Sequence, residues 1–100
     1  MMLNASIVLY HPDWIGEVIP LVEELLRVTY MHTLYLVDNS ETRADPAVLP
    51  QSDKVRYIFL GENVGYGRGH NTALRESIYD GIKYHLVLNS DIELKAEDID

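Results

Sequence analysis

Four short apolar runs of strand length recur along this 100-residue chain, and they constrain its fold more than any other feature. They span residues 5–10, 32–39, 55–60 and 84–88. Helix-like stretches separate the first run from the second and the third run from the fourth. Because strands that alternate with helices favour right-handed crossovers, the runs should form a parallel sheet. We therefore predict an α/β fold, a three-layer sandwich with a mainly parallel sheet.

Two helices are expected between these runs. The first should follow Asp13, a good N-cap, and Pro20 should kink or split it. The second should span residues 68–79, with Gly81 as its C-cap. A single helical turn is expected at residues 46–49. The apolar positions expected to face the core are Ile15, Val18, Ile19, Val22, Leu25 and Leu26 in the first helix, and Leu74, Ile78 and Ile82 beside the second.

Composition excludes several classes of protein. The net charge of −8 argues against non-specific binding of nucleic acid through its phosphates. The chain contains no cysteine, which excludes a disulfide framework and a cysteine-based zinc site and fits a reducing cytosol. It has no basic signal-peptide start and no apolar run near 18 residues, so we predict a soluble protein.

The last residues indicate that more chain follows. Residues 95–100 resemble the start of a helix, and nothing resembling a terminal cap comes after them. We expect residues 1–100 to be a single domain at the front of a larger protein, with its sheet truncated after about the fourth strand. A truncated sheet would leave an edge or face uncovered, so self-association into a homo-oligomer is expected.

A glycine-rich stretch, residues 62–74, connects the third run to the second helix. Gly65, Gly67 and Gly69 recur there at every second position, and glycine allows backbone to approach a ligand closely. A loop that opens a helix presents unpaired N–H groups that suit phosphate. Arg68 adds a fork-shaped cation. The alternative is a flexible turn before an ordinary helix, with Arg68 as a solvated residue.

Polar residues also follow the second and fourth runs. Asp38 begins the triplet D-N-S, and Asp91 ends the triplet N-S-D. In an open parallel sheet, ligands bind beyond the carboxyl ends of the strands. Asp38 could instead cap its own turn, and Asp91 could simply solvate a loop. We favour a binding role for both acids because they lie at the carboxyl ends of strands, where ligands bind.

Familiar nucleotide-binding motifs do not fit. A dinucleotide-binding G-x-G-x-x-G belongs after the first strand, where this chain has His11-Pro12-Asp13. No G-x-x-x-x-G-K-[ST] is present, so a P-loop is excluded. A receiver-like phospho-acceptor domain needs two acids after the first strand, and Asp13 is the single acid in that turn.

Four motifs in order resemble the front half of a family 2 glycosyltransferase with the GT-A fold. They are I-V-L-Y-H-P-D, L-Y-L-V-D-N-S, N-V-G-Y-G-R-G-H-N-T-A-L and L-V-L-N-S-D-I-E. The resemblance extends over nearly the whole chain. The glycine-rich motif is most similar to the branch that contains bacterial rhamnosyltransferases.

The resemblance implies a nucleotide-sugar site. Tyr10 would flank the base, and Asp38 would accept a hydrogen bond from its imide N–H. The N-S-D triplet would be the D-x-D-like motif, in which Asp91 binds Mg²⁺ or Mn²⁺ on the diphosphate. Asn89 stands where the family more often has a first Asp, which removes one carboxylate from the metal site. The implied nucleotide-sugar-binding residues are Tyr10, Asp38, Asn63, Gly65, Gly67, Arg68, Asn71, Asn89 and Ser90, with Asp91 as the metal ligand.

The implied activity is transfer of a sugar from a UDP- or dTDP-sugar donor to a cell-envelope or capsule polysaccharide. The acceptor would be a saccharide or lipid-linked, and the full-length protein cytoplasmic, peripheral to the inner membrane. The catalytic carboxylate would lie beyond residue 100, so we expect this donor-binding half alone to transfer no sugar. The alternative is a non-catalytic nucleotide-sensing or regulatory module on the same scaffold.

Overall fold

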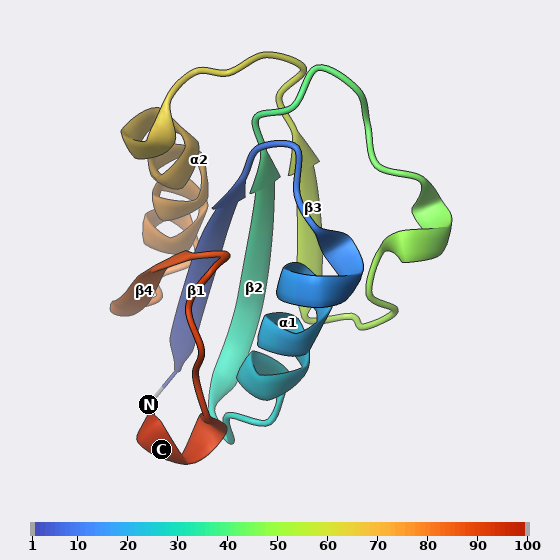
Figure 1. The fold of residues 1–100 in the computed structure, drawn as a ribbon. Coiled ribbons are helices and arrows are strands. Elements are labelled where there is room, and N and C mark those ends of the chain that lie inside the picture. The colour runs from blue at the N-terminus through green and yellow to red at the C-terminus, as the bar shows by residue number, and fades with distance from the viewer. Residues whose placement is uncertain (1, 100) are drawn as a thin grey trace.

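The computed structural model describes residues 2–99, and within that range the chain forms one parallel four-stranded sheet between helices (Figure 1). The strand order is β3-β2-β1-β4. The strands are β1 (Leu3–Leu9), β2 (Met31–Asp38), β3 (Val55–Phe59) and β4 (Tyr84–Asn89). The helical elements are the π-helical turn η1 (Trp14–Val18), α1 (Ile19–Leu26), the 3-10 turn η2 (Pro46–Val48), α2 (Tyr66–Tyr79) and the 3-10 turn η3 (Ala96–Asp98). The predicted strands, their parallel pairing and the turn at 46–49 are confirmed.

The helices α1 and α2 cover opposite faces of the sheet (Figure 1). On the α1 face, Val22 and Leu25 pack with Ile7 in the main hydrophobic core. On the α2 face, Ala73 packs with Val8 in a smaller cluster. The three-layer α/β sandwich predicted from the sequence is therefore confirmed, and it is consistent with a GT-A-type domain.

The strand β1 lies inside the sheet, and all of its residues are buried. Along the chain, β2 and β3 are added on one side of β1, whereas β4 is added on the other. The strand order therefore reverses between β1 and β4. Ligands of open parallel sheets bind at such a reversal, beyond the carboxyl ends of the strands. The loops that follow β1, β2 and β3 gather beyond the arrowheads in Figure 1.

Pro20 splits the first helix, as predicted. The turn η1 has π-helical geometry, and regular α-helix begins at Ile19, with Pro20 in its first turn, where a missing N–H costs least. Asp13 caps η1, accepting a hydrogen bond from Gly16 N at 3.0 Å. The prediction that Ile15 faces the core is wrong, because its side chain is 83% exposed. The wider π-turn shifts the register, so the buried stripe begins at Val18.

The second helix begins two residues earlier than predicted, inside the glycine-rich stretch. Its predicted apolar face is also wrong, since Ile78 is 76% exposed. The buried residues are Gly69, His70, Ala73 and Ser77. A face of small and polar residues suits this position because the strand beneath it presents polar side chains, as described below. No helix within residues 2–99 is long and apolar enough to span a membrane.

Candidate functional site at the carboxyl edge of the sheet

Hydrogen bonds join the segments that follow β1 and β2. The backbone N–H of His11 donates to Ser40 Oγ at 2.8 Å. The backbone N–H of Asn39 donates to the carbonyl oxygen of Leu9 at 2.8 Å. Both Asn39 and Ser40 are buried. The triplet after β2 is therefore a fixed part of the sheet edge.

Asp38 lies at the end of β2 and is 1% exposed. Its Oδ2 accepts a hydrogen bond from the Tyr57 hydroxyl at 2.5 Å, and its Oδ1 accepts one from Ser40 N at 3.0 Å. The turn-capping contact considered as an alternative is thus present. Each carboxylate oxygen has a further lone pair, so the predicted contact with a nucleotide base stays a prediction.

Tyr57 on β3 was not predicted as part of the site. Its hydroxyl accepts from Ala44 N at 3.0 Å while it donates to Asp38. Burial and the hydrogen bond to Asp38 raise the pKa of Tyr57 to about 12, so it remains a neutral donor. The guanidinium carbon of Arg43 lies 5.8 Å from the Tyr57 ring centroid and 5.0 Å from that of Phe59. A cation and aromatic rings therefore adjoin Asp38.

Tyr10 follows β1 and is about half exposed. Its ring stacks on that of His11, with centroids 4.0 Å apart. His11 Nε2 lies 2.5 Å from Glu41 Oε2, and this hydrogen bond lowers the pKa of Glu41. The Tyr10 hydroxyl also donates to Glu41 Oε1 at 3.4 Å. The two stacked rings form an exposed aromatic surface at the predicted base position.

The glycine-rich stretch is tied to the end of β2. Asn39 Nδ2 donates to the carbonyl oxygen of Gly65 at 3.1 Å, and Gly65 N donates to Asn63 Oδ1 at 3.0 Å. Gly65 has φ of 91° and precedes α2 as its N-cap, a conformation that glycine tolerates. The predicted residues Gly67, Arg68 and Asn71 follow on the first turns of α2 and are exposed.

The start of α2 also reaches the end of β4. The Tyr66 hydroxyl donates to Asn89 Oδ1 in a short hydrogen bond. Burial and the nearby carboxylate of Asp91 raise the pKa of Tyr66. The structure therefore brings Asn89 and Asp91 to the same edge as the glycine-rich stretch. Tyr66 was not predicted as part of the site, because no local pattern indicates its contact with a residue 23 positions away.

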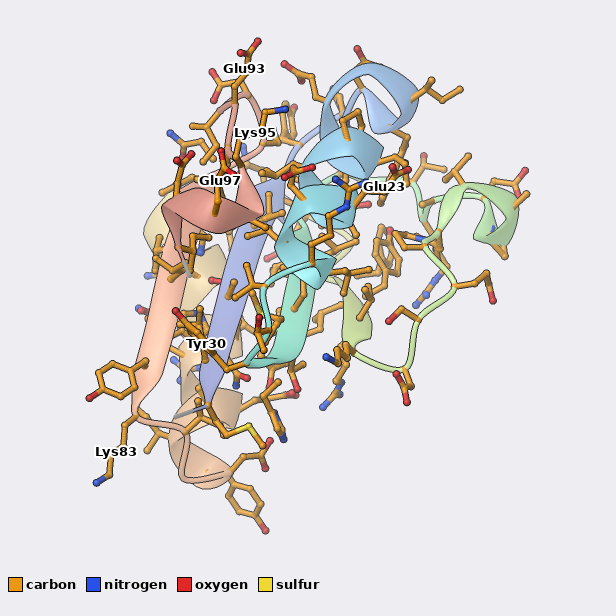
Figure 2. The ribbon with its side chains drawn as sticks, turned by 90° about the horizontal axis from the view of Figure 1, so that it is seen from below. Glu23, Tyr30, Lys83, Glu93, Lys95 and Glu97 are labelled. Carbon is orange, nitrogen blue, oxygen red and sulfur yellow. The ribbon has the colours of Figure 1, made fainter. Side chains whose placement is uncertain are left out.

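Ser90 and Asp91 also border a cavity of about 670 Å³ on the α1 side. The cavity is lined by Glu23 on α1 and by Glu93 and Lys95 of the segment after β4, which are labelled in Figure 2. Apart from Lys95, the charged residues that line the cavity are acidic: Glu17, Glu23, Glu24, Asp91 and Glu93. Carboxylates would repel a diphosphate, so the cavity is a poor phosphate site and the glycine-rich side is the better one.

The residues present fit a divalent cation in one particular way. Within residues 2–99, no group of three or more His, Asp or Glu side chains is placed to hold a metal ion. Asp91 is an exposed single carboxylate beside Asn89. Mg²⁺ is commonly held by one or two carboxylates together with substrate phosphates and water. A cation bound jointly with a diphosphate therefore fits, whereas a protein-only metal site does not.

Comparison with known proteins gives one match. Residues 16–100 match the family described as Glycosyl transferase family 2. No curated protein and no solved structure matches the chain significantly. The match covers the glycine-rich stretch and the ends of β2, β3 and β4.

Proposed function

This chain belongs to glycosyltransferase family 2, and from that premise we propose that its sheet edge binds a UDP- or dTDP-sugar for transfer to a cell-envelope or capsule polysaccharide. Membership of the family implies a nucleotide-sugar donor and an acceptor in general. One observation favours this edge as the donor site. The residues after β2, the start of α2 and the end of β4 are joined by the bonds Asn39–Gly65 and Tyr66–Asn89.

The base would lie near the ends of β1 and β2. The stacked rings of Tyr10 and His11 offer it an exposed aromatic face, and Asp38 offers carboxylate lone pairs to an imide N–H. Uracil and thymine both present that donor, which is why the proposal includes UDP and dTDP. The likeness of the N-V-G-Y-G-R-G-H-N motif to rhamnosyltransferases favours a deoxyhexose donor within this range.

The diphosphate would lie between the start of α2 and the end of β4. The N-terminal end of α2 carries the positive end of the helix dipole, and Arg68 is exposed there. Gly67 has open space around the position of a Cβ atom, so backbone can approach the phosphates. Asp91 would hold a Mg²⁺ or Mn²⁺ ion against the diphosphate, and the ion would stabilise the charge of the leaving group.

In the reaction, the bond between the sugar C1 and the diphosphate oxygen breaks, and the acceptor oxygen forms a new bond to C1. The electron pair leaves with the nucleoside diphosphate, and a base takes the proton of the acceptor hydroxyl. We assign no residue of this chain to that base. The proposal for these residues is limited to binding and orienting the donor at the cytoplasmic face, where lipid-linked acceptors would be met.

Titration of ¹⁵N-labelled chain with UDP, dTDP, GDP and ADP, each with Mg²⁺, tests the proposal. We expect UDP or dTDP to shift the resonances of Tyr10, Gly65 and Asn89, with GDP and ADP much weaker. Asp38→Asn should abolish this preference, whereas Asp53→Asn, in the loop before β3, should not. Equal responses to all four nucleotides, or none, would contradict the proposal. In the full-length protein, donor binding without sugar transfer to any acceptor would favour the regulatory alternative.

A further inference from the structure

A chain of buried polar side chains lies between α2 and the sheet, and the proposed donor site does not use it. It connects five residues on β1, α2 and β4: Asn4, Ser77, His85, Ser6 and His70. The successive distances are 2.7 Å for Asn4 Nδ2 to Ser77 Oγ, 2.7 Å for Ser77 Oγ to His85 Nδ1, 2.8 Å for His85 Nε2 to Ser6 Oγ, and 2.7 Å for Ser6 Oγ to His70 Nδ1. Asn4, Ser6, His70 and Ser77 are each at most 3% exposed.

The direction of the first bond is fixed by backbone. The N–H of Thr33 donates to Asn4 Oδ1 at 2.9 Å, so this atom must be the amide oxygen. The other atom, Nδ2, is then a donor to Ser77. Since the Ser77 oxygen accepts from Asn4, its own hydrogen is available for His85 Nδ1.

The donor and acceptor roles at one hydrogen bond then set those at the next. Burial lowers the pKa of both histidines, so each imidazole is neutral and carries one N–H. When Ser77 gives this hydrogen to His85, His85 accepts at Nδ1 and donates from Nε2 to Ser6. Ser6 in turn donates its hydrogen to His70 Nδ1. In this arrangement His70 holds its proton on Nε2.

This final N–H has no oxygen or nitrogen partner among residues 2–99, although the atom is fully buried. A buried donor without a partner is costly, so its surroundings matter. The ring of Tyr66 lies against His70, with centroids 4.5 Å apart and an angle of 76° between the ring planes. In such an edge-to-face pair, the positive edge of one ring meets the π electrons of the other.

We propose that His70 is a positioning residue of the donor-binding edge, held as its Nε2–H tautomer so that this N–H donates to the π face of Tyr66. Tyr66 in turn bonds to Asn89. This series of hydrogen bonds and ring contacts thus runs from the backbone of β2, beneath α2, to the end of β4. The part that concerns the donor rests on the proposed function, whereas the tautomer and the ring contact do not.

One substitution should reverse the donor and acceptor roles along this series of hydrogen bonds while leaving His70 and Tyr66 unchanged. Asn4→Asp replaces the amide donor by a carboxylate oxygen, and in the ionised form of this side chain Ser77 donates to position 4. His85 then donates from Nδ1 to Ser77, Ser6 donates to His85 Nε2, and His70 donates from Nδ1 to Ser6. Gln51→Glu, an exposed change from amide to acid, is the matched control for charge.

Nitrogen-15 NMR of the histidine rings in the 100-residue chain reads the tautomers directly. We expect His70 to be protonated at Nε2 in the parent chain and in Gln51→Glu, and at Nδ1 in Asn4→Asp. The proton resonance of His70 Nε2–H should be shifted upfield by the ring current of Tyr66. Tyr66→Phe should keep that shift, and Tyr66→Leu should abolish it. In Asn4→Asp the side-chain amide of Asn89 should also shift, and nucleotide affinity should fall two- to fivefold.

Other outcomes would overturn the proposal. A parent His70 protonated at Nδ1, or one that exchanges between tautomers, contradicts the one-way chain. An N–H resonance that ignores Tyr66→Leu contradicts the ring contact, and this variant serves equally if Asn4→Asp does not fold. An Asn89 amide that is unchanged when the tautomer reverses contradicts positioning. If no nucleotide binds the parent chain, the proposed function fails, while the NMR readouts still decide the role of His70.

Discussion

The side-chain amide of Asn39 donates to the carbonyl oxygen of Gly65 at 3.1 Å and so ties the end of β2 to the residue that caps α2. Asn39 is 2% exposed, and Gly65 lies 26 residues further along the chain. This bond orients the glycine-rich stretch relative to Asp38. The predicted base and phosphate contacts depend on that orientation.

Removal of this amide should therefore loosen the start of α2. We expect Asn39→Ala to lower the free energy of unfolding by about 1–3 kcal/mol, because the hydrogen bond to the Gly65 carbonyl is lost and a small cavity forms where the buried amide stood. Urea denaturation measures the loss. Asn71→Ala, on the exposed side of the same helix, should change stability by less than about 0.5 kcal/mol. Equal effects of the two substitutions would contradict the structural role of Asn39.

The glycines at 67 and 69 should respond in opposite ways to the same substitution. A Cβ atom on Gly69 would lie 2.8 Å from Val8 Cγ2, so Gly69→Ala should destabilise the fold by about 1–3 kcal/mol. Gly67 has nothing within 4 Å of that position, and Gly67→Ala should stabilise α2 by up to about 1 kcal/mol. Thermal unfolding of the two variants measures both changes in stability. The double variant Gly69→Ala with Val8→Ala should recover part of the loss, and its failure to do so would exclude the clash as the cause.

Tyr57 should matter through its hydroxyl group alone. Tyr57→Phe leaves Asp38 and the N–H of Ala44 each without one partner, and we expect a loss of about 1–3 kcal/mol. Tyr79→Phe is the matched control because Tyr79 is 91% exposed. Chemical denaturation of both variants provides the comparison. A Tyr57→Phe variant as stable as the control would show that the carboxylate finds other donors.

Acid should destabilise the fold through His70. Its pKa is lowered to about 4 from an ordinary value of 6.5, because burial disfavours the imidazolium and His85 lies nearby. The unfolded chain therefore takes up a proton between these pH values, whereas the folded chain does not. The contribution of His70 is complete above pH 6.5 and is lost as the pH falls towards 4; it amounts to about 2–3 kcal/mol.

Urea unfolding at several pH values between 4 and 7 tests this dependence. Replacement of His70 by Asn should flatten the slope, although His85, whose pKa is also lowered, will retain some of it. Asn71→Ala changes an exposed residue of the same helix and removes no titratable group, so it should leave the slope as it was. An identical slope in the parent chain and the His70 variant would contradict the buried neutral state.

Metal binding should depend on the nucleotide. Because Asp91 is a single carboxylate, we expect calorimetry to detect little Mn²⁺ binding without UDP and clear binding with it. Asp91→Asn should reduce the nucleotide-dependent binding at least tenfold. Glu93→Gln, two residues further along, should have little effect. Strong Mn²⁺ binding without any nucleotide would contradict a jointly held cation.

The sequence was sufficient to predict the strands because each is a short apolar run, and Pro20 marked the break in the first helix. The sequence also located Asp38, Gly65 and Asn89 at strand or helix ends, which the topology then brought to one edge. Periodicity failed for Ile15, where a π-helical turn changed the register.

The buried side of α2 could not be predicted for a different reason. Its residues pair with polar side chains far away in sequence, such as Ser6 with His70, 64 residues apart. A pattern that assigns buried positions to apolar residues cannot detect hydrogen-bonded burial. Tyr57 was missed in the same way, since only its contact with Asp38 distinguishes it from any strand tyrosine.

The buried strand β1 presents Ile7 to an apolar layer on one face and Ser6 to a hydrogen-bonded layer on the other. Apolar contacts are non-directional, so the α1 layer should accept many substitutions that conserve volume. Each link beneath α2 instead requires one donor and one acceptor in a set order. Sequence drift should therefore be rapid on one side of this strand and nearly arrested on the other.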